Sequence, residues 1–497
     1  MADPETVGMF AMLRPRRRWL FLLIAAGAVA WCAPTSERQW LAGDSHVHSH
    51  WSAGYDRRQS PPVVLKGQDA LYSTPRNAVM GRRFGLRWMV TTDHGGPNHA
   101  KFSLSQAYRE LTLSRELVPA VLQFYGMELN MPGMDHHTLI IPYAEDEASV
   151  LYEIEHRFDA NEAWALPPDL ARRTEAARRS ALEYMTTLTR LPILFANHPS
   201  RSARAIGVYG LDEPWEIRTN NDLAPSVYRG MEGAPGHQAT TLAPDGTPRR
   251  DGSGRLAGAR GNYRNIGAGT FGGFDQMTAI VGGLWDTLLG EGRRFWIVAT
   301  SDSHVHYTES VRRGSDFWPG EFHKTYVRAH PTYEDVLDGL RSGRIFAAAG
   351  DLVTELDVVA TASGGSAAIG GTLQVALRER VDITIRFRDP DTPNVHEDNP
   401  TVHRVDLILG EVQGPLSDRT VDRNPTTRVI ARFMGREWTR DGDRYSVATT
   451  LPAIDRDVYI RVRGTSTQDT EPRMDTPGED PWADLWFYSN PIFIEVE

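Results

Sequence analysis

Apolar and polar positions follow two different patterns along the chain, and the pattern changes near residue 350. Before it, short apolar runs each end in a polar residue, at residues 86–93, 121–128, 191–198 and 295–302. Runs of this length and composition predict buried β-strands. Longer segments of helical character, such as residues 170–190, lie between them, so the pattern predicts repeated strand and helix units around a mostly parallel sheet.

From about residue 351, apolar residues recur at every second position, which is typical of strands with one buried face. These runs lie at residues 381–388, 405–409, 429–433 and 458–463, with turn residues between them. They predict a C-terminal antiparallel β-sandwich over residues 351–497, with a surface loop at 469–484 before a last strand at 491–496. A packing module that covers the first domain or supports oligomers is favoured over one that binds carbohydrate or a partner.

The N-terminal segment has the organisation of an export signal. A basic run at residues 14–18, which resembles a twin-arginine signal, precedes thirteen apolar residues at 19–31, too few to span a bilayer comfortably. Small residues at 28–30 suit a cleavage site, so we expect a signal peptide over residues 1–33 and a mature protein that is periplasmic or secreted, without stable membrane insertion. The alternative is an uncleaved signal that anchors the protein in the membrane.

Composition narrows the possible partners. A chain of 497 residues with 40% hydrophobic content can bury a large core and more than one domain. Its net charge of -10 disfavours binding to nucleic-acid duplexes and leaves a small molecule as the expected partner. Cys32 is the only cysteine, so no intramolecular disulfide can form. Residues 222–275, rich in Gly, Pro and Arg, predict a long loop inserted in a first domain at 40–350, where it forms a wall of the substrate pocket.

Histidines and carboxylates gather at the ends of the apolar runs and near residue 46. The clusters are Asp44, His46 and His48; Asp93 and His94; Glu128 with Asp135, His136 and His137; His198; and Asp302, His304 and His306. Divalent ions bind neutral imidazoles and carboxylates that converge from different parts of a fold. His46 and His48 are two positions apart, so in a strand they point to the same side. Because active sites in α/β barrels form where the strands end, the clusters predict a multinuclear metal site there.

The order of these motifs over residues 43–350 resembles the polymerase and histidinol phosphatase (PHP) superfamily of metal-dependent phosphoesterases. The family motifs are a His-x-His, a Thr-Asp-His, a Glu followed about ten residues later by a His, a His-Pro and an Asp-x-His, which correspond here to His46 and His48, His94, Glu128, His198, and Asp302 and His304. Residues 339–350 resemble the end of this domain in exported members similar to carbaryl hydrolases.

The resemblance implies a distorted (β/α)7 barrel, similar to a TIM barrel, that binds two or three divalent ions of zinc, manganese or iron at its rim. The implied roles are a first ion bound by His46, His48 and Asp302, a bridge between two ions at Glu128, a second ion completed by His137 and His198, and a third bound by His94 and His304. His136 competes with His137, because both lie near the expected spacing from Glu128. His137 is favoured.

One family feature is missing from this chain. Relatives place an Asp about seven residues after the first His of the opening motif, and it serves the third ion. Here that position is Ala53, which cannot coordinate a metal. The third site therefore lacks a ligand, borrows Asp56 or Asp93, or is not occupied, and a binuclear centre is an open alternative.

Such a centre supports hydrolysis by a metal-activated hydroxide that attacks phosphorus or a carbonyl carbon. Candidates to protonate the leaving group are His304, His306, His50 and Tyr307. Arginines near the clusters, suited to an anionic substrate, are Arg57, Arg58, Arg76, Arg201 and Arg204. Arg201 is favoured, because it lies three residues after His198.

Other polar residues have ordinary structural explanations. Asp44 and Asp93 either orient an imidazole through its second ring nitrogen or cap a turn. The histidines expected to be structural or on the surface are His99, His156, His323, His330, His396 and His403.

The leading prediction is an exported metal-dependent enzyme that hydrolyses phosphoester bonds. The alternative is a hydrolase of carbamates, carboxyl esters or amides with the same metal centre. A prediction of a different class, suggested by the β-sandwich, is a non-catalytic protein that binds glycans of the cell envelope.

Overall fold

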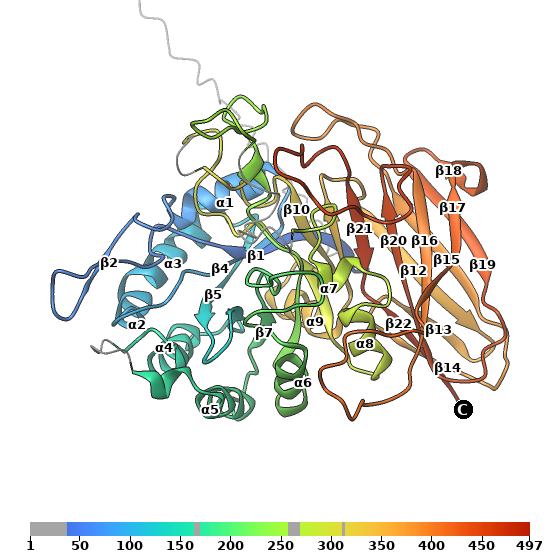
Figure 1. Ribbon diagram of the computed structural model, residues 1–497, viewed down its shortest axis with the longest axis horizontal. Helices are drawn as coiled ribbons and strands as arrows, with labels where there is room; N and C mark the ends of the chain where they lie inside the picture. Colours follow the sequence, from blue (N-terminus) through green and yellow to red (C-terminus); the bar gives the residue numbers. More distant parts are fainter. Residues whose placement is uncertain (1–36, 164–168, 257–268, 311–313) are drawn as a thin grey trace, which may run out of the picture. The chain divides into compact units, whose positions relative to one another are not determined.

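The computed structural model describes residues 37–163, 169–256, 269–310 and 314–497, and Arg38–Glu497 form one compact unit (Figure 1). The predicted signal peptide and part of the Gly-rich segment lie outside the described residues, so export stays a prediction. No helix in the described ranges is long and apolar enough to cross a membrane.

The fold is mixed α/β, with strands through the whole described chain and α-helices before residue 350. The strands are β1 (Gln39–Val47), β2 (Gly54–Asp56), β3 (Val63–Leu65), β4 (Trp88–Thr91), β5 (Leu122–Asn130), β6 (His136–Ile140), β7 (Ile193–Ala196), β8 (Tyr228–Ala234), β9 (Trp296–Ala299), β10 (His323–Ala329), β11 (Ile345–Ala349), β12 (Glu355–Ala362), β13 (Gly365–Ala368), β14 (Thr372–Val375), β15 (Asp382–Arg388), β16 (Arg404–Glu411), β17 (Arg428–Met434), β18 (Thr439–Asp441), β19 (Arg444–Thr450), β20 (Val458–Thr465), β21 (Trp486–Ser489) and β22 (Ile492–Val496). The α-helices are α1 (Thr74–Arg83), α2 (Ala100–Phe102), α3 (Tyr108–Leu117), α4 (Glu147–Phe158), α5 (Glu175–Thr186), α6 (Pro214–Leu223), α7 (Gln276–Ala279), α8 (Leu284–Gly290) and α9 (Tyr333–Ser342). Shorter helical turns are η1 (Ser103–Ala107), η2 (Leu170–Arg173), η3 (Gln238–Thr241) and η4 (Gly435–Glu437).

A 15-stranded sheet contains the strands predicted before residue 350, and it continues into the C-terminal half through the pairing of β11 with β21. All four predicted apolar strands are present, as β4, β5, β7 and β9. Parallel pairs join β1 to β4, β4 to β5, β7 to β8 and β8 to β9. The expectation of a mostly parallel sheet misses two strands. β6 pairs antiparallel with both β5 and β7, and β10 pairs antiparallel with both β1 and β11.

In the strand order β1-β4-β5-β6-β7-β8-β9, the first and last strands come together at their carboxyl ends. Val47, the last residue of β1, forms a parallel bridge with Ser303, and the amide of His48 donates to the Ser303 carbonyl at 3.1 Å. Residues that follow β9 therefore lie directly beside residues that follow β1, although these segments are more than 250 positions apart. This contact brings the first and last histidine clusters of the chain to one place.

The prediction that residues 222–275 form one long loop is wrong, because β8 lies within them and pairs with β7 and β9. Its glycines allow neighbouring strands to approach closely. A Cβ on Gly230 would lie 2.0 Å from the Trp296 carbonyl oxygen, and one on Gly233 would lie 2.8 Å from the Ile297 side chain. The glycines therefore indicate tight packing of a buried strand, not turns.

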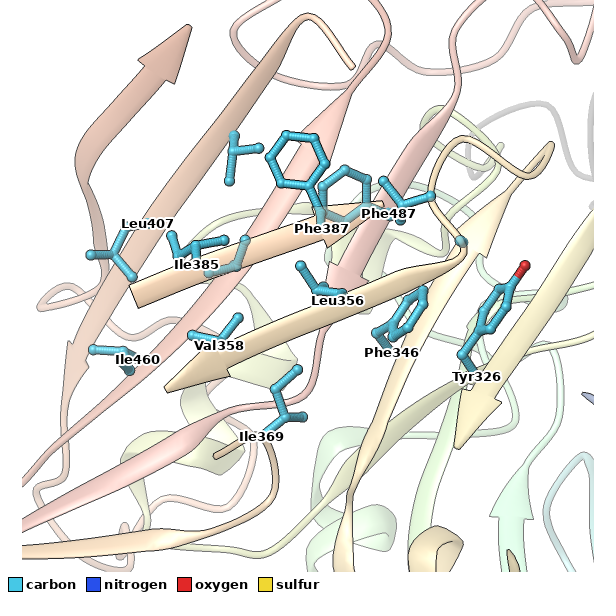
Figure 2. Close-up of a cluster of buried hydrophobic side chains, with 14 of the residues drawn as sticks. Tyr326, Phe346, Leu356, Val358, Ile369, Ile385, Phe387, Leu407, Ile460 and Phe487 are labelled. Carbon is cyan, nitrogen blue, oxygen red and sulfur yellow. The ribbon is translucent and has the colours of Figure 1, made fainter. Parts of the chain in front are cut away.

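The alternating C-terminal pattern correctly predicts strands, which appear as β15, β16, β17, β20 and β22. A separate five-stranded antiparallel sheet has the order β13-β12-β15-β19-β18. Figure 2 shows Leu356 and Ile385 from this sheet near Leu407 and Phe487 from the large sheet, all within one buried hydrophobic cluster. The apolar faces of the two sheets thus share a core, as strands with one buried face require.

Candidate metal centre

Four side chains from three strand ends form the most buried part of the site: His46 and His48 at the end of β1, Glu128 near the end of β5, and Asp302 after β9. All four are at most 2% exposed. The Nε2 atoms of His46 and His48 lie 2.9 Å apart, and each lies 3.1 Å from Oδ1 of Asp302. Glu128 approaches both imidazoles at 3.4 Å, through Oε1 to His46 and Oε2 to His48.

These separations fit atoms that share one ion. Two ligand atoms, each about 2.1 Å from a metal, lie about 3.0 Å apart at a right angle and about 3.4 Å apart in a tetrahedron. The donor set of two imidazoles and two carboxylates also matches the ligands that zinc, manganese and iron bind. Burial, together with nearby His304, lowers the pKa of His48 to about 3, which keeps its lone pair available at neutral pH.

Glu128 also faces a second set of histidines. Its Oε2 lies 2.9 Å from Nδ1 of His94, and its Oε1 lies 3.0 Å from Nδ1 of His136 and 2.9 Å from Nε2 of His198. One carboxylate therefore contacts imidazoles on two sides, which is the arrangement of a ligand that bridges two ions. Although burial alone raises the pKa of the Glu128 carboxyl, the neighbouring histidines hold that pKa well below its usual value.

Two buried carboxylate oxygens support metal binding most directly. Oε2 of Glu128 and Oδ1 of Asp302 accept no hydrogen bond within the described part of the chain. Burying a charged oxygen without a hydrogen bond costs several kcal/mol, and a bound ion or water offsets that cost. Both oxygens point at the imidazole nitrogens, where a cation would satisfy them.

A third group forms at the more exposed edge of the site from His48, His94, His304 and Asp69. Oδ2 of Asp69 lies 3.4 Å from Nε2 of His304 and 4.0 Å from Nε2 of His94. Ser52 donates to the same oxygen at 2.6 Å, which fixes the carboxylate in place. Nδ1 of His304 lies 2.9 Å from the Asp302 carbonyl and donates to it, so the Nε2 lone pair faces Asp69.

Asp69 thus brings a carboxylate to the corner that Ala53 leaves without one. Neither of the two residues suggested from the sequence does so. Asp56 pairs with the Arg58 guanidinium at 2.8 Å, and Asp93 accepts from the backbone and hydroxyl of Ser49 at 2.5 and 2.8 Å. Asp69 lies between β3 and α1, outside every family motif, so the sequence carried no signal for it.

The choice of His137 over His136 is not supported, because the structure places His136 beside Glu128. In the antiparallel β5–β6 pair, His136 lies opposite Asn130, two positions from Glu128 and therefore on its side of the sheet. His137 lies opposite Leu129 and faces the other side. Its ring nitrogens contact the Asp135 carbonyl at 3.0 Å and the Tyr228 hydroxyl at 3.3 Å.

We expect His136→Ala to affect metal binding and His137→Ala to affect stability. His136→Ala should lower the number of ions bound per chain, because it removes an imidazole from the Glu128 group. His137→Ala should keep the ions but lower the free energy of unfolding by about 1–3 kcal/mol, because it leaves buried polar partners unpaired. Elemental analysis and urea unfolding of both variants check this, and loss of ions only in His137→Ala would contradict it.

The other proposed catalytic histidine, His306, lies outside these clusters. Its Nε2 contacts Glu321 at 3.0 Å, its Nδ1 contacts Thr308, and its ring stacks on Trp318 at 5.0 Å. Both nitrogens therefore have partners that hold the ring away from the centre. His304, in contrast, belongs to the third group and stacks on His48 with ring centroids 3.8 Å apart.

Arg201 lies at the edge of the site, paired with Asp135. Its Nε donates to Asp135 at 3.3 Å, and its side chain stays 30% exposed. The charges of Glu128 and Asp302 act on the guanidinium together with that of Asp135. A partly exposed cation next to a buried cluster is suited to meet an anionic substrate.

The remaining candidates have local partners. Asp44 accepts from the amides of His46 and Ser301 at 3.1 and 3.2 Å, so it caps the backbone and does not orient an imidazole. His50 contacts Glu110 at 2.8 Å, and Tyr307 is 5% exposed in the hydrophobic core. Among the described residues, the metal clusters include none of the histidines expected to be structural, namely His99, His156, His323, His330, His396 and His403.

Two residues of the site were missed because β8 was not recognised as a strand. Glu232, within β8, lies 2.6 Å from Nδ1 of His46 and accepts from the His198 amide at 2.6 Å. It therefore orients an imidazole, the role first considered for Asp44. His237, three residues after β8, lies 2.6 Å from Asp302. The rule that places His198 after β7 and Asp302 after β9 would have found His237 as well.

Comparison with known proteins adds no assignment: no family model and no curated protein matches the chain.

Proposed function

We propose that this protein is a metal-dependent hydrolase that cleaves phosphoester bonds. The observation that carries the proposal is the position of Glu128, whose two oxygens face five histidines from four separate segments of the chain at 2.9–3.4 Å. A structural metal site needs one closed set of about four ligands, whereas adjacent ion positions that share a carboxylate are typical of hydrolytic centres.

The same proposal includes the fold. We propose a distorted (β/α)7 barrel of the PHP kind followed by a β-sandwich. The bridge between Val47 and Ser303 supports closure of the strands from β1 to β9, and the core shared by the two C-terminal sheets supports the sandwich. The site then lies at the carboxyl ends of the strands, the usual position in such barrels.

The residues divide into ligands and supports. His46, His48, Glu128 and Asp302 would hold the first ion, Glu128 with His136 and His198 the second, and His94, His304 and Asp69 a third. Divalent ions bound there would supply a water of lowered pKa and positive charge that stabilises the transition state. Glu232 keeps His46 in the tautomer whose Nε2 faces the centre, and Ser52 restrains both His48 and Asp69.

Arg201 favours a phosphate over a neutral substrate. Its guanidinium donors suit phosphate oxygens, and its exposed part is free to approach them at the edge of the cluster. Carbamates and carboxyl esters remain the alternative substrates of the same centre, since the ions alone do not select between phosphorus and carbon.

A side-by-side assay tests this function. With manganese or zinc added, we expect the purified protein to hydrolyse an aryl phosphate faster than an aryl carbamate or acetate. Arg201→Ala should raise KM for the phosphate about tenfold or more, because a hydrogen bond to a charged group contributes about 1.5–3 kcal/mol. The matched control is Arg179→Ala, an exposed arginine of α5 that is not among the candidate site residues, which should leave KM unchanged.

Failure on the phosphate with turnover of the carbamate would replace the proposed reaction by carbonyl hydrolysis. Glycan binding without turnover of any ester would reject the enzyme altogether.

A further inference from the structure

His237 occupies a strained position directly against the metal centre. It follows β8, and its φ of 58° lies in the left-handed region that is uncommon for residues other than glycine. The preceding Gly236 makes the position accessible, because a Cβ there would lie 2.0 Å from the Ser301 carbonyl oxygen and 2.4 Å from Cβ of Asp302. The amide of His237 donates to that same carbonyl at 3.3 Å. The chain therefore holds this imidazole beside Asp302 at some conformational cost.

Both ring nitrogens of His237 face carboxylates. Nε2 lies 2.6 Å from Oδ2 of Asp302, and Nδ1 contacts Oδ1 of Asp316. Asp316 is buried, and its other oxygen accepts from the amides of His304 and Val305 at 2.6 and 2.8 Å. A continuous chain of contacts thus runs from the His304 segment through Asp316 and His237 to Asp302.

Distance decides whether His237 shares an ion with Asp302 or holds it by a hydrogen bond. Atoms that share an ion lie about 3.0–3.4 Å apart, which fits the 3.1 Å between Asp302 Oδ1 and the histidines at 46 and 48. The 2.6 Å between His237 Nε2 and Asp302 Oδ2 is shorter and matches a hydrogen bond to a carboxylate. The 2.6 Å contact of His46 with Glu232, which is also outside the proposed ligand set, is equally short.

We propose that His237 is a positioning residue, which holds Oδ2 of Asp302 so that Oδ1 stays directed at the first ion. Asp316 in turn fixes the orientation of the His237 ring. This role rests on the proposed metal centre. It adds a residue that follows β8 and lies outside all of the sequence motifs. Partners of this kind order a ligand before the ion binds, and their loss typically weakens metal affinity about 10–100-fold.

The test measures metal binding itself, in the full chain, by titration of Mn²⁺ or Zn²⁺ against a chromogenic chelator. His237→Ala should bind as many ions as the wild type at saturation, with affinity for the tightest site about 10–100-fold weaker. His237→Gln should recover most of this affinity, because its amide can donate to Asp302. The control is His330→Ala, a histidine outside the metal clusters, which should leave the titration unchanged.

Three outcomes would overturn the positioning role. One ion fewer at saturation in both variants would make His237 a ligand, and unchanged affinity in His237→Ala would leave it no role at the centre. His237→Gln decides the question even if His237→Ala does not fold. A wild-type protein that binds no ion would reject the proposed function together with this inference, whereas the first two outcomes leave the proposed function intact.

Discussion

Glu128→Gln is expected to lose bound ions and to lower the rate of hydrolysis by more than ~100-fold. Removal of a residue that only hydrogen-bonds a metal ligand typically costs up to about that factor. Glutamine has nearly the same size, so the packing around β5 should persist. It replaces one carboxylate oxygen by an NH₂ group that cannot bind a cation, and it removes the charge that both groups of histidines share. Every contact of Glu128 with imidazoles on its two sides is then affected at once.

Elemental analysis and the aryl phosphate assay check this expectation. The matched control is Glu216→Gln, another buried glutamate, which pairs with Arg178 at 3.0 Å and lies outside the clusters of described residues that could bind a metal. The control should keep its ions and its activity. A Glu128→Gln protein with the wild-type number of ions would show that this carboxylate is not the bridge.

Asp286→Ala is expected to destabilise the fold by about 3–5 kcal/mol, the largest effect on stability that we predict. Asp286, in α8, is buried and accepts two hydrogen bonds from Arg461 of β20, at 2.8 and 2.7 Å. Arg461 is itself fully buried. Removing the aspartate leaves an uncompensated guanidinium in the interior, next to the junction of the helical half with the C-terminal strands.

Urea unfolding of three variants distinguishes the free energy lost with the buried ion pair from the effect of replacing an aspartate elsewhere. Asp286→Ala combined with Arg461→Met should regain much of the lost stability, because it removes the unpaired charge. Asp391→Ala, which breaks an exposed pair with Arg440, should leave the free energy of unfolding unchanged. If Asp286→Ala is as stable as the wild type, the buried pair does not hold these two halves together.

The part of the fold that the sequence predicts well is the part where local pattern decides structure. The apolar runs that became β4, β5, β7 and β9 have lengths and side chains that suit buried strands. At the ends of three of them, Glu128, His198 and Asp302 lie among the clustered histidines and carboxylates. The alternation after residue 351 works for the same reason, since one buried face imposes a period of two.

The errors arise where contacts between distant segments of the chain determine the structure. β8 was not predicted because its glycines suggest a loop. In the structure these glycines allow close contact with β9, which the sequence does not reveal. The preference for His137 is not supported, because the antiparallel register of β6 places His136, and not His137, on the side of Glu128. Asp69 could not be found, since its carboxylate reaches His304 only through the folded path of the segment between β3 and α1.

If Glu128 joins two ion positions in one buried centre, the purified protein must hold at least two metal ions. After loading with Mn²⁺ or Zn²⁺ and removal of loosely bound metal, elemental analysis should find at least two ions per chain, and three when the Asp69 corner is filled. Fewer than two ions per chain after careful loading would show that Glu128 does not bridge two ions.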